Sequence, residues 1–342
     1  MERKLATIRK ISKIEPIKGA DAIELATVDG WKVVVAKNVG HKVGDSIIYC
    51  EIDSFLPIKD EFEFLRKSSY KKMGDKEGFR LRTIKMLGQI SQGLILPIQI
   101  IGEENSNMEI GTDVSEMLGI VKYEAPIPAS LSGEMKGGFP SFLFKTDEER
   151  IQNLTNFYEK YKEKTFYVTE KLDGSSATFY FKDGVFGVCS RNYELSEPEE
   201  GGKTNSFWKA AAEIDLKNLM VGLGKNICLQ GELVGEGIQG NIYKLKGQHV
   251  FFYNVFDIDK QEYYDFENFV KTIESLGLKT VPILYESYKL PDSIGELLIQ
   301  ADGVSEINNS MAKREGIVVR SLDRKISFKV ISNNFLLGEK QK

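Results

Sequence analysis

The sequence predicts an α+β protein in two parts, an N-terminal β-barrel followed by a mixed α+β domain with antiparallel sheets. Three observations lead to this prediction. Short apolar segments separated by turn signals fill residues 1–118. A stretch rich in Pro and Gly follows and has the composition of an extended linker. Beyond it, strand-like and helix-like segments are mixed, and strands mostly neighbour strands. We therefore expect a barrel domain at 1–120, a linker at 121–145 and a second domain at 146–342.

The expected strands of the first part are short, apolar-rich and bounded by turn residues. Asp29-Gly30 lies between two of them and suits a hairpin turn, because this dipeptide accepts the positive φ angles that such turns need. Five or six short strands favour the OB fold, a small barrel, which a short helix at Asp113–Leu118 would close. The strands are expected at Lys4–Ile11, Ile23–Val28, Trp31–Ala36, Ser46–Glu51, Phe79–Thr83 and Gly93–Pro97.

One stretch of the first part is strongly basic. Its cations are interleaved with Tyr70 and Phe79, a pattern typical of a surface that follows phosphates and stacks bases. A solvated loop without a partner would have the same composition, and the sequence leaves both interpretations open. The cations are Arg66, Lys67, Lys71, Lys72, Lys76, Arg80, Arg82 and Lys85. We take Arg66, Lys67, Lys71, Lys72, Arg80 and Arg82 as the candidate nucleic-acid contacts.

The second part is predicted to begin with a helix at 151–161, because its apolar residues recur at helical spacing. Thr146 and Glu149 have the spacing of a capping box in front of it. Further helices are expected at Phe207–Met220 and Phe266–Leu276, and strands at Ile227–Leu233, His249–Ile258, Gly316–Ser321 and Ile326–Val330.

Composition limits the function classes. The net charge of −4 means that a nucleic-acid partner must meet a local basic face. Cys50, Cys189 and Cys228 are odd in number and lie in apolar contexts, so we expect buried thiols in a reducing, intracellular compartment. Two histidines are too few to build a zinc site with these cysteines. No apolar run has membrane-spanning length.

The chain is organised around Lys171-Leu172-Asp173-Gly174. We expect a strand at Phe166–Val168, a polar turn with this tetrapeptide, and a second strand at Ala177–Phe181. A lysine on a tight corner beside a carboxylate suits nucleophilic attack by an amine, either on carbon to form a Schiff base or on phosphorus in nucleotidyl transfer. The tetrapeptide alone favours the simpler interpretation, a turn with an exposed lysine and a capping Asp.

Gly235-Glu236-Gly237-Ile238-Gln239-Gly240 matches the dinucleotide-binding pattern Gly-x-Gly-x-x-Gly. That pattern requires a helix to begin there. Asn241-Ile242-Tyr243-Lys244 and then another strand follow instead, so we interpret this segment as a loop and reject a dinucleotide site.

Polar residues then accumulate on the strands that follow Lys171. Arg191 ends a strand, Glu232 lies in an apolar one, and Phe256-Asp257 ends another. Glu315 opens a strand, and Lys329 lies among apolar residues in the last one. A structural ion pair between Lys329 and a glutamate is the simplest account of these last two.

Lys171-x-Asp173-Gly174, Ser190-Arg191, Glu232, Phe256-Asp257, Glu315-Gly316 and Phe328-Lys329 together resemble, in order and spacing, the motifs of covalent nucleotidyltransferases. The segments at 145–153 and 231–241 are similar to those of ATP-dependent RNA ligases. The N-terminal barrel resembles the OB domain that precedes the transferase domain in RNA ligases of the Naegleria type. DNA ligases and capping enzymes carry their OB domain after the last lysine motif, whereas the predicted barrel here comes first.

The resemblance implies a reaction and its participants. Lys171 would accept AMP from ATP, with Asp173 and Lys329 as further catalytic residues. AMP would then pass to an RNA 5′-phosphate, and a 3′-hydroxyl would displace it. We expect a monomer. Asp173 and Glu315 are oxygen donors suited to Mg²⁺ or Mn²⁺. Many RNA ligases have Lys-x-Lys in the last motif, but Ser327 stands in the first of these positions here, and Lys325 is therefore not assigned.

The resemblance also implies the nucleotide contacts. Glu232 would bind a ribose hydroxyl, and Phe256 would stack on adenine. Arg191 would bind phosphate or the acceptor end, and Arg150 the outer phosphates. Glu170 and Gly174, which flank the reactive turn, complete the expected nucleotide site.

Three alternatives stay open at this point. Another covalent nucleotidyltransferase, a DNA ligase or a capping enzyme that uses GTP, would carry related motifs. A non-enzymatic RNA-binding protein with an OB fold would explain the first domain but not the ordered motifs of the second. A Schiff-base lyase would use the same kind of lysine and would form an adduct that borohydride traps.

Overall fold

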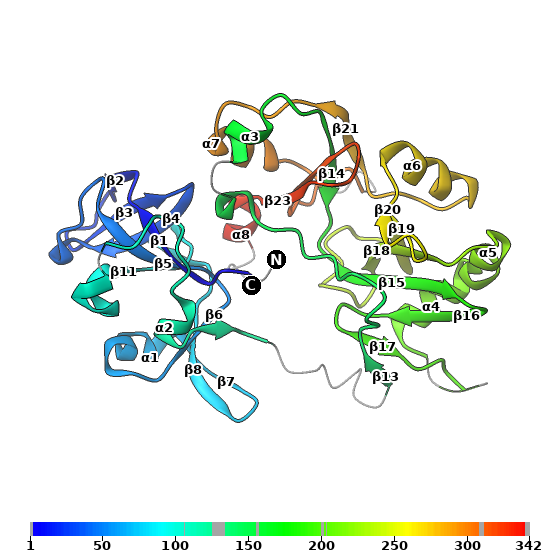
Figure 1. The fold of residues 1–342 in the computed structure, drawn as a ribbon, viewed down its shortest axis with the longest axis horizontal. Coiled ribbons are helices and arrows are strands. Elements are labelled where there is room, and N and C mark those ends of the chain that lie inside the picture. Colours follow the sequence, from blue (N-terminus) through cyan, green and yellow to red (C-terminus); the bar gives the residue numbers. More distant parts are fainter. Residues whose placement is uncertain are drawn as a thin grey trace. The chain divides into compact units, whose positions relative to one another are not determined.

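The computed structural model describes residues 3–105, 107–124, 134–154, 157–199, 202, 204–307 and 311–338. The chain divides into two compact units, each described here by itself (Figure 1). Unit 1 consists of Met1–Pro126, Gln152–Thr155 and Leu336–Lys342, and unit 2 of Ile127–Ile151 and Asn156–Phe335. The first boundary falls inside the expected linker at 121–145, of which residues 125–133 lie outside the described part of the chain.

Unit 1 is built from short antiparallel strands in four sheets, ordered β1-β5-β11, β2-β3-β4, β9-β10 and β12-β6-β8-β7. These strands are β1 (Ala6–Lys10), β2 (Lys13–Pro16), β3 (Ile23–Val28), β4 (Trp31–Ala36), β5 (Ser46–Cys50), β6 (Ser54–Pro57), β7 (Tyr70–Met73), β8 (Lys76–Arg80), β9 (Ile84–Met86), β10 (Gln89–Ser91), β11 (Leu94–Pro97) and β12 (Val121–Lys122). Two short helices, α1 (Arg66–Ser69) and α2 (Ser115–Leu118), lie between strands in the sequence.

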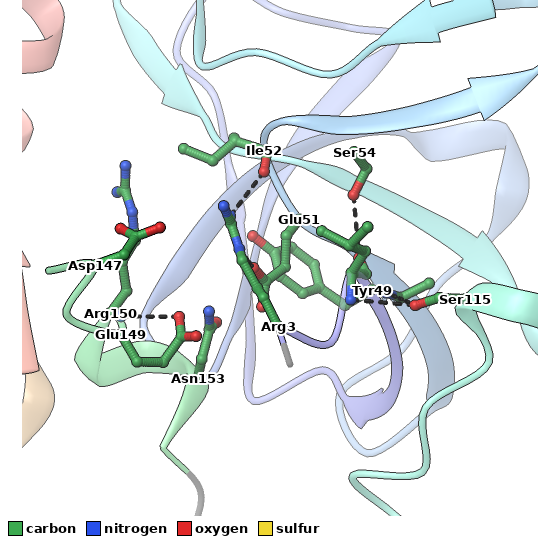
Figure 2. Close-up of polar contacts among 12 residues, drawn as sticks. Arg3, Tyr49, Glu51, Ile52, Ser54, Ser115, Asp147, Glu149, Arg150 and Asn153 are labelled. Atoms are coloured by element: carbon green, nitrogen blue, oxygen red, sulfur yellow. Dashed lines mark hydrogen bonds and ion pairs between the residues drawn. The ribbon is translucent and has the colours of Figure 1, made fainter. Parts of the chain in front are cut away.

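Two apolar clusters hold unit 1 together, one around Phe62 and Phe79 and the other around Trp31 and Tyr49. Polar contacts fix its N-terminal segment. Arg3 Nε pairs with Glu51 Oε2 at 2.8 Å, and Arg3 Nη2 donates to the Ile52 carbonyl at 2.9 Å (Figure 2). These bonds join the start of the chain to the end of β5.

Most of the strands that the sequence predicted for unit 1 lie within two residues of their expected ends, β3 and β4 among them, but β2, β6, β7, β9, β10 and β12 were not predicted. Asp29 and Gly30 have φ angles of 46° and 86°, which confirms the hairpin turn. One strand is displaced from its prediction: the strand placed at Phe79–Thr83 is β8, which runs from Lys76 to Arg80. At the start of the expected linker, Val121 pairs with Phe55 in β6.

Unit 2 contains a seven-stranded antiparallel sheet with the order β13-β17-β16-β15-β18-β19-β20. Its strands are β13 (Met135–Gly138), β15 (Ser175–Lys182), β16 (Val185–Cys189), β17 (Tyr193–Leu195), β18 (Ile227–Gly235), β19 (Gln248–Asp257) and β20 (Glu262–Tyr263). One face carries Phe179, Leu229 and Phe252 and packs in the main core. Residues of α4 (Ser206–Glu213), α5 (Leu216–Gly222) and α6 (Phe266–Ser275) complete this core.

A second antiparallel sheet of unit 2 has the order β21-β14-β22-β23. It consists of β14 (Phe166–Lys171), β21 (Ile283–Tyr288), β22 (Gly316–Ser321) and β23 (Ser327–Ile331). The unit also contains α3 (Phe157–Tyr161) and α7 (Ile294–Ala301). The last helix, α8 (Asn333–Gly338), begins in unit 2, and its residues from Leu336 onward are assigned to unit 1. The described parts of the chain contain no helix both long enough and apolar enough to cross a membrane.

The helix expected at 151–161 is absent as one element, because a 3₁₀ turn at Ile151–Asn153 precedes α3. The capping box was also wrong, since Thr146 Oγ1 lies 3.0 Å from the Tyr253 hydroxyl and residues 145–149 are neither helix nor strand. The helix expected at Phe207–Met220 is two helices. Asp215 separates them with a φ of 50°, a left-handed conformation that a continuous helix cannot contain.

A buried polar network ties both sheets of unit 2 to residues 144–148. Arg320 of β22 donates to Glu148 Oε1 at 2.9 Å and to Thr169 Oγ1 of β14 at 2.8 Å. Arg324, 3.8 Å from the same carboxylate, donates to Asn254 Oδ1 of β19 at 3.1 Å. Asn254 donates in turn to Gln230 of β18 at 3.0 Å, and Gln230 to the Phe144 carbonyl at 2.8 Å.

Glu148 is the carboxylate on which this network converges. Its burial acts to raise the pKa, but the two guanidinium groups outweigh burial and hold the pKa at about 2, against an ordinary value of 4.5. A lowered pKa stabilises the fold above the ordinary value, and this stabilisation is lost as the pH falls from 4.5 toward 2. A shift of this size corresponds to about 3 kcal/mol.

We therefore predict that Glu148→Gln lowers the free energy of unfolding of unit 2 by about 3 kcal/mol at pH 7 and by progressively less toward pH 3. Trp208 lies in unit 2 and Trp31 in unit 1, so urea unfolding followed by fluorescence in a Trp31→Phe background reports on unit 2. A difference between variant and parent that stays constant or grows on acidification would contradict the ion pair's role.

Candidate active site

Lys171 is the last residue of β14, and the next strand, β15, belongs to the other sheet. The expected polar turn is thus only Leu172–Gly174, and Lys171 itself is paired with Gly316 in the sheet. Because residues opposite each other in antiparallel strands share a face, Lys171, Arg320 and Lys329 lie on one face of the four-stranded sheet. The structure therefore brings together the first and last lysines of the motif set.

Gly174 fixes the turn against β18. A Cβ atom at this residue would lie 2.5 Å from the Leu233 carbonyl oxygen and 2.8 Å from Glu232 Cγ. Neither the backbone oxygen nor the neighbouring strand can retreat without opening the sheet, so only glycine allows this approach. Ser176, two residues later, is paired with Glu232. The turn therefore sets Lys171 beside the strand that carries Glu232.

The Lys171 amine is held among carboxylates. Its Nζ atom lies 2.7 Å from Glu315 Oε2. Burial acts to lower the pKa of Lys171, but Glu315 and Glu232 outweigh it, and the pKa ends above its ordinary value. Before ATP and metal arrive, the amine is thus protonated, and it becomes a nucleophile only when its carboxylate partners are engaged elsewhere.

Glu232 is the most perturbed carboxylate of the site. Burial raises its pKa to about 8; Lys171 opposes the rise, while Glu315 and Asp173 add to it. At neutral pH the group is therefore largely an uncharged acid that can donate a hydrogen bond. Such a group suits a ribose hydroxyl, the contact expected for it.

Asp147 holds two of the predicted cationic residues. Its Oδ1 lies 2.9 Å from Lys329 Nζ, and its Oδ2 lies 3.1 Å from Arg191 Nη2. Burial lowers the pKa of Lys329, Asp147 opposes this, and Lys171 and Arg150 add to the lowering. Arg150 follows on the same segment and forms a parallel bridge with Lys329, next to the bond from the Lys329 amide to the Glu149 carbonyl at 2.8 Å. The Arg150 amide is bonded to Glu149 Oε1 (Figure 2).

Two expected nucleotide residues are placed differently. Glu170 alternates with Lys171 along β14, so its carboxylate lies on the opposite face of the sheet and accepts from the Glu306 amide at 2.9 Å. Phe256 lies on the same face of its sheet as Glu232, but only 1% of it is exposed. Phe144 and Tyr263 meet its ring edge-on. The ring therefore offers no free face in this state.

The basic stretch of unit 1 contains two kinds of cation. Arg66, Lys72 and Arg80 pair with Glu63, Glu77 and Asp53 at 2.6, 2.8 and 2.7 Å. Lys67, Lys71 and Arg82 are exposed, and no carboxylate of the described residues forms an ion pair with them. Phe79 is fully buried and cannot stack on a base, which corrects that part of the expectation.

A divalent cation fits the donor set around Lys171. Asp173 and Glu315 are hard oxygen donors, and mutual repulsion with Glu232 shows that the site carries an excess of carboxylates. Within the described ranges no group of three or more His, Cys, Asp or Glu side chains is placed to hold a metal. Two carboxylates suit Mg²⁺ or Mn²⁺, which keep waters and take phosphate oxygens as their other ligands.

Sequence reasoning missed Asp147, Glu148 and Arg320 as parts of the site. Asp147 and Glu148 lie between Thr146 and Glu149, which were interpreted as a capping box, and received no role of their own. Arg320 gave a signal that went unused. It lies in the apolar strand Gly316–Ser321, where a charge requires a buried partner.

Comparisons with known proteins agree with this geometry. A family model described as RNA ligase matches residues 164–331, and one described as an OB-fold domain matches residues 5–98. A structure of Naegleria gruberi RNA ligase with pyrophosphate is 44% identical, with a TM-score of 0.86 and complete coverage of both chains. Its glutamate-to-alanine variant with AMP and Mn is 44% identical at a TM-score of 0.88, covering 99% of this chain and 100% of that one.

A lysine-to-alanine variant of the same enzyme with ATP and Mn is also 44% identical, with a TM-score of 0.87 over 99% of this chain and 100% of that chain. A search of curated proteins returned no match.

We predict that Glu315→Gln lowers the pKa of Lys171 in the protein free of ATP and metal, because burial then outweighs the remaining carboxylates. The pKa can be followed by NMR of lysine amines carrying ¹³C-methyl groups, with Lys171→Arg to assign the signal. A pKa equal to or above that of the parent protein would show that Glu315 does not hold the charged amine.

Proposed function

Because this chain belongs to the RNA ligase family, we propose that it joins RNA 3′-hydroxyl and 5′-phosphate ends through an AMP group carried by Lys171. The protein is an ATP-dependent RNA ligase that uses a divalent metal, as the match over the whole chain to ligase structures with ATP and Mn and with AMP and Mn shows. The observation that carries the role of Lys171 is its amine, 2.7 Å from Glu315 at the junction of the two sheets.

In the first step, the Lys171 nitrogen attacks the α-phosphorus of ATP. The N–P bond forms, the bond from the α-phosphorus to the bridging oxygen breaks, and pyrophosphate leaves. The amine must lose its proton first, and a group with an ordinary lysine pKa of about 10.4 is almost fully protonated near neutral pH. Glu315 holds the charged form of the amine, so a cation held by Glu315 would weaken this pairing and favour the neutral amine.

Asp173 and Glu315 are the residues that would hold the cation. When bound, it offsets the negative charge that develops on the α-phosphate. The protein's part is to fix the direction of the two carboxylates, which Gly174 and the pairing of Lys171 with Gly316 achieve.

The cationic residues around Asp147 are suited to the phosphates. Lys329 and Arg191 share this one carboxylate, so both have a donor to offer to an incoming anion. Arg150, on the strand bridge beside Lys329, is assigned to the outer phosphates. Glu232 binds a ribose hydroxyl as an uncharged acid, and Phe256 contacts adenine once Phe144 moves from its ring.

The second and third steps act on RNA. AMP passes from Lys171 to the 5′-phosphate of one strand, and the 3′-hydroxyl of the other displaces it. Among the candidate nucleic-acid contacts of unit 1, we assign RNA binding to Lys67, Lys71 and Arg82, since Arg66, Lys72 and Arg80 are already paired with carboxylates.

We also infer where the protein works and in what form. Cys50, Cys189 and Cys228 are buried and free, as expected for a reducing intracellular compartment. A single chain carries every motif assigned to the reaction, and we expect a monomer, which sedimentation would test.

We predict that Lys171→Ala abolishes ATP-dependent joining but retains ATP-independent sealing of RNA that already carries a 5′-AMP, because only the first two steps use the amine.

Lys329→Ala should slow adenylylation, and a rise in pH should recover part of the loss by deprotonating Lys171.

Joining activity in Lys171→Ala with unmodified RNA would refute the assignment of the nucleophile. A Lys329→Ala variant with the pH profile of the parent would remove Lys329 from this step. Loss of activity in a chelator is expected for all forms, and full activity there would exclude the metal.

For RNA binding, the structure supplies two matched triple variants. The first variant replaces three exposed cations that form no ion pair with a described carboxylate, Lys67, Lys71 and Arg82, by Ala. The second replaces three cations that are paired with carboxylates, Arg66, Lys72 and Arg80, by Ala. The first should lower the slope of log affinity against log salt for single-stranded RNA by about 2, and the second by less. Adenylylation should be unchanged in both. A larger loss from the paired set would contradict the assignment.

A further inference from the structure

The loop between β18 and β19 contains the Gly-x-Gly-x-x-Gly sequence, to which the ligase chemistry assigns no role. Its backbone is unusual. Besides its glycines, Gln239, Asn241 and Lys244 have positive φ angles of 43°, 48° and 52°. Side chains rarely adopt this region, and it persists only where the surroundings enforce it. Contacts with the rest of unit 2 must therefore hold the loop in this backbone conformation, which suggests that the conformation has a function.

The loop closes on itself. Gly235, with a φ of 117°, approaches Gly247 so closely that a Cβ would lie 2.2 Å from the Gly247 carbonyl oxygen. The Glu236 amide donates to that oxygen at 2.9 Å. Inside the loop, the Asn241 side chain donates to the Leu245 carbonyl at 2.8 Å and accepts from its amide at 3.0 Å.

This closed loop turns Tyr243 inward. Its exposed fraction is 1%, and its ring packs in a cluster with Leu172, Val234 and Tyr253. The hydroxyl accepts a hydrogen bond from the Asp173 amide at 2.6 Å. Burial raises the pKa of this phenol, the bond from the Asp173 amide opposes the rise, and the charges of Glu170 and Glu315 add to it, so the pKa ends well above its ordinary value.

The hydrogen bond between the Asp173 amide and the Tyr243 hydroxyl lies in the turn that directly follows Lys171. The Asp173 amide is a backbone donor in the three-residue turn between Lys171 and β15, and its acceptor, the Tyr243 hydroxyl, comes from a buried side chain. Gly174 fixes one side of this turn by its contact with β18. Tyr243 fixes the other, through the loop that continues from that same strand.

We propose that Tyr243 is a positioning residue of the ligase, whose hydroxyl fixes the Leu172–Gly174 turn and thereby the places of the Lys171 amine and the Asp173 carboxylate. The inference rests on the proposed role of Lys171. It gives the loop a function unrelated to dinucleotide binding, namely delivery of one hydroxyl to the turn that follows the nucleophile.

The test is single-turnover formation of the protein–AMP adduct by Tyr243→Phe, which keeps the ring and removes the hydroxyl. The rate at saturating ATP should fall about tenfold, the change that corresponds to one lost hydrogen bond. The ATP concentration for half-maximal rate should change less than about twofold, because ground-state binding is untouched. The Mn²⁺ concentration for half-maximal rate should rise, since Asp173 is the candidate ligand.

Tyr49→Phe is the matched control. Tyr49 is also 1% exposed and loses one hydrogen bond, to the Gln92 carbonyl at 3.0 Å, but it lies in unit 1. It should lower thermal stability without changing the adenylylation rate or the Mn²⁺ requirement. Asn241→Ala, which leaves Tyr243 in place and removes two bonds of the loop, should slow the same step by a smaller factor.

A parental rate and Mn²⁺ requirement in Tyr243→Phe would overturn the inference, as would equal slowing by Tyr49→Phe. The proposed function is tested separately by Lys171→Ala. Loss of the adduct in that variant together with a normal rate in Tyr243→Phe would reject the role of Tyr243 and leave that of Lys171 intact.

Discussion

The contact of Gly174 with strand β18 is the constraint on which the rest of the active site depends. No side chain fits between this turn and the Leu233 carbonyl, so the end of β14 and the strand of Glu232 keep a fixed separation. Lys171 is the last paired residue before the turn, and Glu315 directly precedes its partner Gly316. Backbone pairing, together with the absence of a Cβ atom at Gly174, therefore fixes the positions of Lys171, Glu315 and Glu232 before any ligand binds.

Charge balance then determines what the site can accept. Glu232 is largely uncharged at neutral pH, and the carboxylates of Glu315 and Asp173 still exceed the single charge of Lys171, which favours a cation. Glu315 holds the amine in its protonated form. Asp147 shares its two oxygens between Lys329 and Arg191, and Lys329 lies on the same sheet face as Lys171. One site thus offers both carboxylates and cations, which suits a triphosphate bound with a metal. Glu148, next to Asp147, anchors this segment to buried arginines and carries no reacting atom.

The sequence predicted what local pattern determines and missed what tertiary contacts determine. Strands Ile23–Val28 and Trp31–Ala36 could be placed to the residue because the Asp29-Gly30 turn between them is a local signal. The segment around Thr146 could not, since its Thr–Glu spacing suits a helix while its side chains bond to strands far away in the chain. The burial of Phe79 and Phe256 was equally invisible, because an aromatic residue beside charges has the same sequence pattern whether it is exposed or buried. Motif order identified the site residues through resemblance, but only the register showed that Glu170 lies on the opposite face from Lys171.

The most direct test of the account is to locate the AMP group in the native protein. The unmodified enzyme is incubated with ATP and Mn²⁺ without RNA, digested under conditions that preserve the N–P bond, and analysed by tandem mass spectrometry of its peptides. The account predicts one adenylylated residue, Lys171, in the peptide that carries Asp173 and Gly174. AMP on Lys329 or on any residue other than Lys171, or recovery of all nucleotide in noncovalent form, would contradict it.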